Sequence, residues 1–399
     1  MAKKRIFINM HYMELGGAER ALLGLLNAID TTKVEVDLFI NQHTGPFMKL
    51  IPKKINLLPE MRGYNAIERP MKAIAREGQF KVLIARIIAR IKYKIYLKRN
   101  HYSRDASASH YVFEEVSKVL PSLHFLGHYD LAISFLDPPH IVQTKVNASK
   151  KIEWIHTDWG SHKFNYDLLY KYWKANDYII SISRAITLSF CNAFPGLENK
   201  IIEIENILSP SVIRQQALAY SPKEMQNFDG LKVISVGRLS YPKNFECIPY
   251  VVKILKEAGI NLHWWILGPG QRLEINQAIA ETGTQEEISL MGPRDNPYPY
   301  MAACDIYVQP SRDEGKSITV REAQILYKPV IITRYATSSS QINSGVDGLI
   351  CDMNIQAIAE AIRSITLNKE MRNKIVDYLH THDYGNESEV NKIYKLLNL

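Results

Sequence analysis

Cysteine is scarce in this chain of 399 residues, and its few cysteines are scattered. No two of them form a C-x-x-C pair, and none has a neighbouring pair of histidines. These absences argue against a disulfide framework and against a zinc site of the usual spacing, and they fit a reducing cytoplasm. The four cysteines are Cys191, Cys247, Cys304 and Cys351.

Long apolar runs and two common ligand motifs are also missing. No stretch of about 18 consecutive apolar residues occurs, so we expect no transmembrane helix. The opening MAKKRIFINMHYM is basic but lacks the apolar core of a secretion signal, so we expect no signal peptide. The chain has no G-x-G-x-x-G fingerprint for a nicotinamide cofactor and no D-x-D pair for Mg²⁺ or Mn²⁺. We therefore expect no cofactor and no bound metal.

Short apolar strands alternate with helical stretches along the chain. With 46% hydrophobic and 23% charged residues, the chain can bury substantial cores, and its length suggests about two or three domains. The expected strands are 5–10, 34–40, 129–135, 151–156, 178–183 and 201–206, followed after a polar joint by 231–237, 262–268, 287–292, 305–311, 329–333 and 348–352. Such alternation predicts parallel sheets with helices on both faces.

Two runs of this alternation predict two doubly wound, Rossmann-like α/β domains. We expect an N-terminal domain over 1–209, joined by a C-terminal helix at 384–399, and a C-terminal domain over 229–383. Ligands of such sheets bind at the carboxyl ends of the strands, and a cleft between two facing domains is a natural site.

Two glutamates, Glu314 and Glu322, flank the start of one short helix in SRDEGKSITVREAQ. The backbone N–H groups of GKSIT would attract an anion at the helix N-terminus. Glu314, itself negative, suits the hydroxyls of a sugar, and Glu322 could hold a cis-diol such as ribose. Alternatively, Glu322 forms a capping box with Thr319, and Glu314 is a solvated acid of the loop.

Further polar residues follow three other strands. Arg238 and Lys243 come after 231–237 and together suit a diphosphate, although exposed cations of a loop would look the same. Gly16 and Gly17 precede a helix and permit close approach of a ligand, or form a plain tight turn. His156 ends the strand 151–156, where either a functional or a structural role fits.

The net charge of +8 comes from one segment. Residues 72–104 contain ten lysines and arginines and a single acid, Glu77. Within 81–99 the isoleucines recur at helical spacing and Arg86, Arg90, Lys94 and Lys98 line up four apart. This pattern predicts a basic amphipathic helix that lies on an anionic membrane surface. In the alternative, the isoleucines pack on the N-terminal domain and the cations face water.

Taken together, these stretches resemble the family 4 (group 1) glycosyltransferases, which are retaining nucleotide-sugar enzymes of the GT-B fold, here of the type that builds capsular or surface polysaccharide. The resemblance spans most of the chain. It includes ELGGAER, WIH, VGRLSYPKN, LGPG, the segment from MGPRDNPYPYMAACD through VREAQ, and GVDGLI. The two glutamates seven residues apart, with the upstream Arg and Lys, are its most specific part. EGKS departs slightly from the family, which often has Phe or Pro near Lys316 and Ser317.

The resemblance implies a role for each matched residue. Glu314, Arg238, Lys243 and His156 would be catalytic: Glu314 would bind the donor sugar, the two cations would neutralise the diphosphate, and His156 would contact the transferred sugar. Glu322 would hold the ribose. The remaining donor-binding residues would be Gly16, Gly17, Gly315, Lys316, Ser317, Ile318 and Thr319.

The implied activity is transfer of a hexose from a nucleotide-diphosphate sugar to a glycan or lipid-linked acceptor, with retention, in surface polysaccharide or glycolipid assembly. The enzyme would be cytoplasmic, peripheral at the inner face of the membrane, and would not bind nucleic acid. An epimerase of the same fold and a catalytically silent scaffold subunit remain alternatives. A dehydrogenase lacks its glycine fingerprint, and a nucleic-acid binder is supported only by the basic segment.

Overall fold

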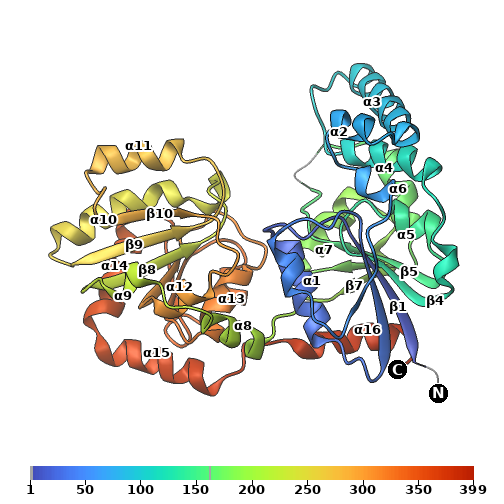
Figure 1. Cartoon of the computed structure of the whole chain (residues 1–399). Coiled ribbons are helices and arrows are strands. Elements are labelled where there is room, and N and C mark those ends of the chain that lie inside the picture. Colours follow the sequence, from blue (N-terminus) through green and yellow to red (C-terminus); the bar gives the residue numbers. More distant parts are fainter. Residues whose placement is uncertain (1–2, 161–162) are drawn as a thin grey trace. The chain divides into compact units, whose positions relative to one another are not determined.

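The computed structural model describes residues 3–160 and 163–399, and the chain divides into two compact units (Figure 1). Unit 1 comprises Met1–Ile207 and Glu387–Leu399, and unit 2 comprises Leu208–Asn386. The segment 209–229, which the sequence analysis treats as a joint, holds two short helices of unit 2. The last residues of the chain return to unit 1.

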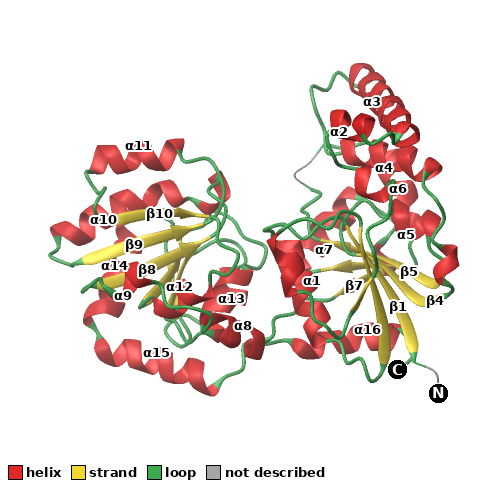
Figure 2. Ribbon diagram, viewed as in Figure 1, coloured by secondary structure: helices red, strands yellow, loops and turns green. Residues whose placement is uncertain are grey.

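Unit 1 contains a seven-stranded sheet in which every pairing is parallel (Figure 2). Its strand order is β3-β2-β1-β4-β5-β6-β7. The strands are β1 Lys4–Met10, β2 Val34–Ile40, β3 Asn56–Leu57, β4 Tyr129–Ser134, β5 Ala148–Ile155, β6 Tyr178–Ser181 and β7 Ile201–Glu203. The helices are α1 Gly17–Ala28, α2 Met71–Arg76, α3 Phe80–Arg99, α4 Ala108–Val119, α5 His140–Lys145, α6 Tyr166–Ala175, α7 Arg184–Ala193 and α16 Val390–Leu396.

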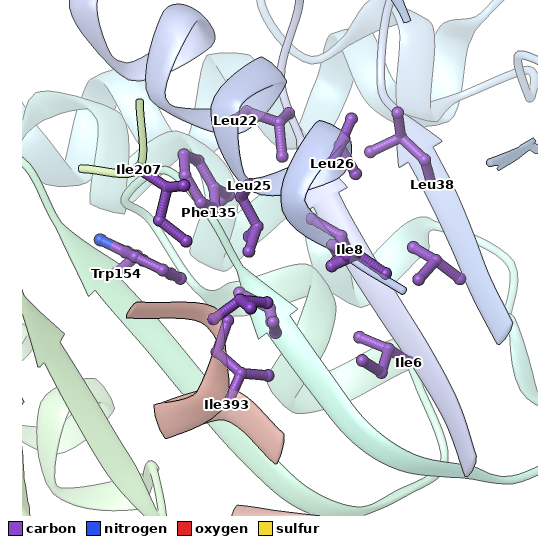
Figure 3. Close-up of a cluster of buried hydrophobic side chains, with 14 of the residues drawn as sticks. Ile6, Ile8, Leu22, Leu25, Leu26, Leu38, Phe135, Trp154, Ile207 and Ile393 are labelled. Atoms are coloured by element: carbon purple, nitrogen blue, oxygen red, sulfur yellow. The ribbon is translucent and has the colours of Figure 1, made fainter. Parts of the chain in front are cut away.

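Alternate residues of the strands of unit 1 belong to two separate hydrophobic cores, one on each face of the sheet. Ile6 and Ile8 of β1 point to the face covered by α1 and α16, where Ile393 joins the same cluster (Figure 3). Phe7, between them, points to the opposite face, which α3 and α4 cover. A parallel sheet buried on both faces reads as a nearly continuous apolar run, which is why RIFINM and VEVDLFI are recognisable in the sequence.

Unit 2 contains a six-stranded parallel sheet of order β10-β9-β8-β11-β12-β13. The strands are β8 Leu231–Val236, β9 Leu262–Leu267, β10 Ile288–Gly292, β11 Ile306–Gln309, β12 Val330–Thr333 and β13 Leu349–Cys351. The helices are α8 Pro210–Ala217, α9 Lys223–Gln226, α10 Ile248–Glu257, α11 Leu273–Thr282, α12 Tyr298–Ala303, α13 Ile318–Ile325, α14 Ile355–Leu367 and α15 Lys369–Thr381. Helices α10 and α14 cover one face, and α12 and α13 cover the other.

The two doubly wound parallel-sheet domains expected from the sequence are confirmed. Each of the expected strands has a counterpart within a few residues of its predicted position, and only the two-residue β3 was not anticipated. In both sheets the strand order reverses once, between β1 and β4 in unit 1 and between β8 and β11 in unit 2. Such a reversal opens a crevice at the carboxyl ends of the two central strands, where ligands of this kind of fold bind.

Candidate functional site

The reversal point of unit 2 brings together two loops, 237–244 after β8 and 310–317 after β11. The backbone N–H of Arg312 donates to the carbonyl of Pro242 over 2.7 Å. The side-chain amide of Asn244, a residue in the left-handed conformation with φ 56°, donates to the carbonyl of Pro310 over 2.9 Å. These cross-links fix the loops relative to each other before any ligand binds.

Glu314 and Lys243, one from each loop, form an ion pair. The Glu314 Oε1 atom accepts from Lys243 Nζ, and also from Ser311 Oγ at 2.7 Å and from Gln309 Nε2 at 3.3 Å. The two paired side chains are only 10% and 22% exposed. Partial burial limits screening by water, so this pair is held more firmly than an ordinary surface salt bridge.

A column of buried polar side chains supports Glu314 from below. Tyr307 Oη donates to Gln309 Oε1 over 2.6 Å, and Gln309 Nε2 donates to Ser311 Oγ over 2.9 Å. All three residues are buried and come from or directly follow β11. The sequence analysis missed them. Their signal was present, however, because polar residues at alternate positions of an apolar strand share one face.

The start of α13 is less open than predicted. Ser317 is the N-cap, and its backbone N–H already donates to Gln341 Oε1 over 3.2 Å. Thr337 Oγ1 donates to the carbonyl of Glu314 over 2.7 Å. Gly315, by contrast, is exposed, and a Cβ at this position would meet open space. Gln341 and Thr337 are therefore positioning residues for this loop that the sequence did not reveal.

Glu322 lies fully buried in α13, where its Oε1 accepts from Tyr298 Oη over 2.7 Å. The alternative interpretation as a capping box is wrong. The N-cap is Ser317, and Thr319 lies within the first turn, where its hydroxyl is hydrogen-bonded to Tyr307 Oη at 2.7 Å. Ile318, the first residue of the helix, is partly buried against the core of unit 2.

Arg238 follows β8 and is exposed, with no ion pair among residues 3–160 and 163–399. The loop after β9 packs tightly beside it. Gly268 has φ 147°, and a Cβ there would overlap the carbonyl of Gly237. The glycines of LGPG are therefore required by the close approach of two strand-end loops.

In unit 1, Gly16 is the N-cap of α1 in an extended conformation, with φ −149°. A Cβ at Gly16 would meet the carboxylate of the buried Glu19, whereas a Cβ at Gly17 would meet nothing within 4 Å. The carboxylate of Glu19 thus lies at the start of α1, where the positive end of the helix dipole stabilises its negative charge.

His156 directly follows β5 and stacks among aromatic rings. Its ring centroid lies 5.0 Å from that of Phe135, and its plane is within 7° of that of Trp154. Burial lowers the pKa of His156 to about 4, so its imidazole is neutral at pH 7. Its Nε2 atom is buried and has no hydrogen-bond partner within the described part of the chain.

A second polar cluster of unit 1, absent from the sequence analysis, lies beside the ends of β4 and β5. Asp137 Oδ2 is 2.6 Å from His110 Nε2, and Glu153 Oε2 accepts from Asn176 Nδ2 over 3.1 Å. Burial, together with the charge of Asp137, raises the pKa of the fully buried Glu153 well above its usual value. Burial and the neighbouring His110 lower the pKa of His140 well below its usual value.

Among residues 3–160 and 163–399, no group of three or more His, Cys, Asp or Glu side chains is arranged to hold a metal ion. Over the same ranges, no helix is long and apolar enough to cross a membrane.

The chain is similar to known glycosyltransferases. Residues 220–381 match the family model described as glycosyl transferases group 1. The chain is 23% identical over 226 residues to the lipopolysaccharide core biosynthesis glycosyltransferase LpsE of Rhizobium meliloti, covering 54% of this chain and 65% of that protein. It is 28% identical over 149 residues to an N-acetylgalactosaminyltransferase of Campylobacter jejuni that acts on a diphospho-undecaprenol-linked sugar, covering 36% and 40%. The chain thus spans under two thirds of the length of these relatives.

Among solved structures, Anabaena HepE in complex with UDP and glucose has a TM-score of 0.67 and 15% identity, over 99% of both chains. Staphylococcus aureus TarM has a TM-score of 0.66 and 14% identity, over 100% of this chain and 99% of that one. These likenesses extend the shared fold to both units. The chain therefore has the GT-B fold, and its residues 220–381 match the group 1 glycosyl transferases.

Proposed function

We propose that the protein transfers a hexose from a nucleotide-diphosphate donor to an acceptor hydroxyl, with retention, in the assembly of a surface polysaccharide or glycolipid. The observation that carries this proposal is the Lys243–Glu314 pair at the reversal point of unit 2. The relatives named above are glycosyltransferases, which favours transfer over the epimerase alternative. A silent scaffold would have little reason to keep this preorganised pair.

The donor-binding roles follow from the hydrogen-bond donors and acceptors that each side chain does not use within the protein. The ammonium of Lys243 has three N–H donors, and one of them serves Glu314, which leaves the others for a phosphate oxygen. The side-chain hydrogen bonds of Glu314 within the described residues all fall on Oε1, so we assign Oε2 to a hydroxyl of the donor sugar. Arg238 supplies a second cation from the same loop, and Gly315 lets the backbone approach the donor closely.

Glu322 would hold the ribose from its buried place in α13. Its carboxylate already accepts from Tyr298, and a carboxylate has about four lone-pair sites. This arrangement would make Tyr298 a positioning residue for the ribose contact.

The reaction proceeds on one face of the donor sugar. The bond between the anomeric carbon and the phosphate oxygen breaks, the acceptor oxygen bonds to that carbon from the same side, and the acceptor proton passes to the departing phosphate. Arg238 and Lys243 stabilise the negative charge that grows on the diphosphate, as preorganised donors do in an oxyanion hole. His156, neutral at pH 7, is suited to a hydrogen bond with the transferred sugar rather than to a charge interaction.

The acceptor would be a glycan or a lipid-linked sugar, met at the inner face of a membrane. The named acceptor of the Campylobacter relative supports a lipid-linked substrate. Residues 81–99 support the location, since they contain many cations and no acid.

The experiment is a screen of UDP-, GDP- and ADP-sugars by thermal shift, followed by transfer assays with the donor that stabilises the protein. Lys243→Ala should lower turnover by roughly 10²-fold or more, because it removes a cation from the leaving group. Lys253→Ala, at an exposed lysine of α10, is the matched control and should leave turnover unchanged. Near-normal turnover of both Lys243→Ala and Glu314→Ala would overturn the assignment.

A further inference from the structure

Helix α3 presents an apolar stripe to solvent. It packs on unit 1, beside α4, through the small buried side chains of Val82, Ala85 and Ala89 (Figure 1). Six large apolar residues along its other side are between 40% and 61% exposed. They are Phe80, Ile84, Ile87, Ile88, Ile91 and Ile95. The alternative of the sequence analysis, in which the isoleucines pack on the domain, is therefore wrong.

Exposed cations border this stripe on both sides. At 100° per residue, Lys81, Lys92 and Arg99 fall along one edge of the stripe, and Arg90 and Lys94 fall along the other, while Lys98 lies within the stripe at the C-terminal end of the helix. The helix contains no aspartate or glutamate. An apolar band between two rows of long cationic side chains is the arrangement of a helix that lies in a membrane interface, with its charged heads reaching up to the lipid phosphates.

Arg86, which the sequence places in a cationic row, belongs to the fold instead. Its guanidinium donates to the carbonyls of Ala66 and Arg69, and burial lowers its pKa. Lys92 is partly committed as well, because its ammonium pairs with Glu115 at 2.6 Å. The cations that remain for lipid are therefore chiefly Arg90, Lys94 and those at the ends of the helix.

We propose that α3 inserts its isoleucine stripe into the interfacial region of an anionic bilayer and so anchors the protein to the membrane. Charge complementarity selects this occupant. A second copy of α3 would bring the same cationic edges together without any acid to pair with them, whereas anionic headgroups match both edges at once. Membrane binding by α3 is argued from its surface alone. Only the role of the anchor, which is to hold the enzyme near a lipid-linked acceptor, rests on the proposed function.

The experiment uses the full chain, without donor sugar, and sedimentation with vesicles of phosphatidylcholine alone or with phosphatidylglycerol. Wild type should sediment only with the anionic vesicles, and less so in high salt. Ile84→Ser combined with Ile91→Ser should weaken binding at least tenfold, because two isoleucines no longer leave water. Arg90→Gln combined with Lys94→Gln should weaken it by about 25-fold or less, at up to fivefold for each cation.

Matched controls lie elsewhere on unit 1. Leu188→Ser removes an exposed apolar residue of α7, and Lys53→Gln removes an exposed cation, and both variants should bind as wild type does. A tryptophan in place of Ile88 should be quenched by lipids brominated in their acyl chains. This quenching reports insertion, which adsorption by charge alone would not produce.

Three outcomes would overturn the proposal. They are recovery of wild type in the supernatant with anionic vesicles at low salt, unchanged binding of the isoleucine variant, and a wild-type dimer that the isoleucine variant converts to a monomer. The last would identify the stripe as an interface between copies. Transfer activity without vesicle binding would leave the proposed function standing, and vesicle binding without transfer would leave this anchor standing.

Discussion

Replacing the buried Glu153 with glutamine should remove a pH dependence from the stability of unit 1. Glu153 is fully buried, and its burial beside Asp137 raises its pKa well above the usual value. The folded chain therefore keeps a proton on this carboxyl that the unfolded chain releases above about pH 4.3. Stability is then fully present below that pH and falls as the pH rises toward the folded pKa, by about 1.4 kcal/mol per pH unit.

Glutamine preserves the hydrogen bonds of the protonated acid. Its carbonyl can accept from Asn176 Nδ2, as Glu153 Oε2 does at 3.1 Å, and its amide can donate toward Asp137. Glu153→Gln should therefore match wild type near pH 4.5 and exceed it progressively at higher pH. For each pH unit over which the wild-type carboxyl keeps its proton in the folded chain, the gain should be about 1.4 kcal/mol.

The assay is urea unfolding followed by fluorescence at a series of pH values, with wild type and variant compared at each pH. Comparison removes the contribution of His156, whose lowered pKa acts in the opposite direction and makes stability rise with pH between about 4 and 6.5. Glu35→Gln, at an exposed glutamate of β2, is the control and should follow wild type. Parallel curves for wild type and Glu153→Gln from pH 5.5 to 7.5 would refute the reasoning.

Three further predictions concern unit 2. Excess EDTA should leave transfer activity intact, and a complete loss that Mn²⁺ restores would contradict this expectation. Gly268→Ala should destabilise the unit by about 2 kcal/mol or more, since its Cβ would overlap the carbonyl of Gly237, while Gly315→Ala should change the urea midpoint little. Gln341→Ala should raise the KM for the donor several-fold with a smaller change in kcat, because the amide of Ser317 loses the partner that fixes its loop; an unchanged KM would deny Gln341 this role.

The sequence placed Lys243 and Glu314 in loops that follow strands, although it did not predict that the two side chains pair. Both residues lie in loops that follow parallel neighbouring strands, and the carboxyl ends of such strands share one edge of the sheet. The apolar periodicity of the strands and the turn residues that end them were therefore enough to place both residues at the same edge of the sheet.

Contacts between remote segments were not predictable in this way. Gln341 lies 24 residues after Ser317, and no spacing rule links a glutamine there to a helix start. The cluster of His110, Asp137 and Glu153 joins a helix, a loop and a strand. Its one local sign was an acid within the apolar run KIEWIH, which a pattern search reads as an exposed position of a strand.

The orientation of α3 shows a different limit. Its sequence has two candidate faces for packing, a broad one of isoleucines and a narrow one of Val82, Ala85 and Ala89. Hydrophobicity alone favours docking of the isoleucines. The smaller side chains allow the backbone of α3 to approach α4 closely, and this close approach leaves the larger ones outside.

The return of residues 387–399 to unit 1 bears on how the protein is made. Val390 and Ile393 of α16 belong to the same core cluster as β1, so the core of unit 1 lacks these side chains until the whole of unit 2 has been synthesised. Unit 2 is continuous in sequence and can therefore fold before unit 1 is complete. This order is the reverse of the usual one, in which the N-terminal domain folds first during synthesis. Until α16 has been synthesised, the early strands of unit 1 expose the apolar surface that α16 covers. We therefore expect chaperones to bind the nascent chain mainly during this period.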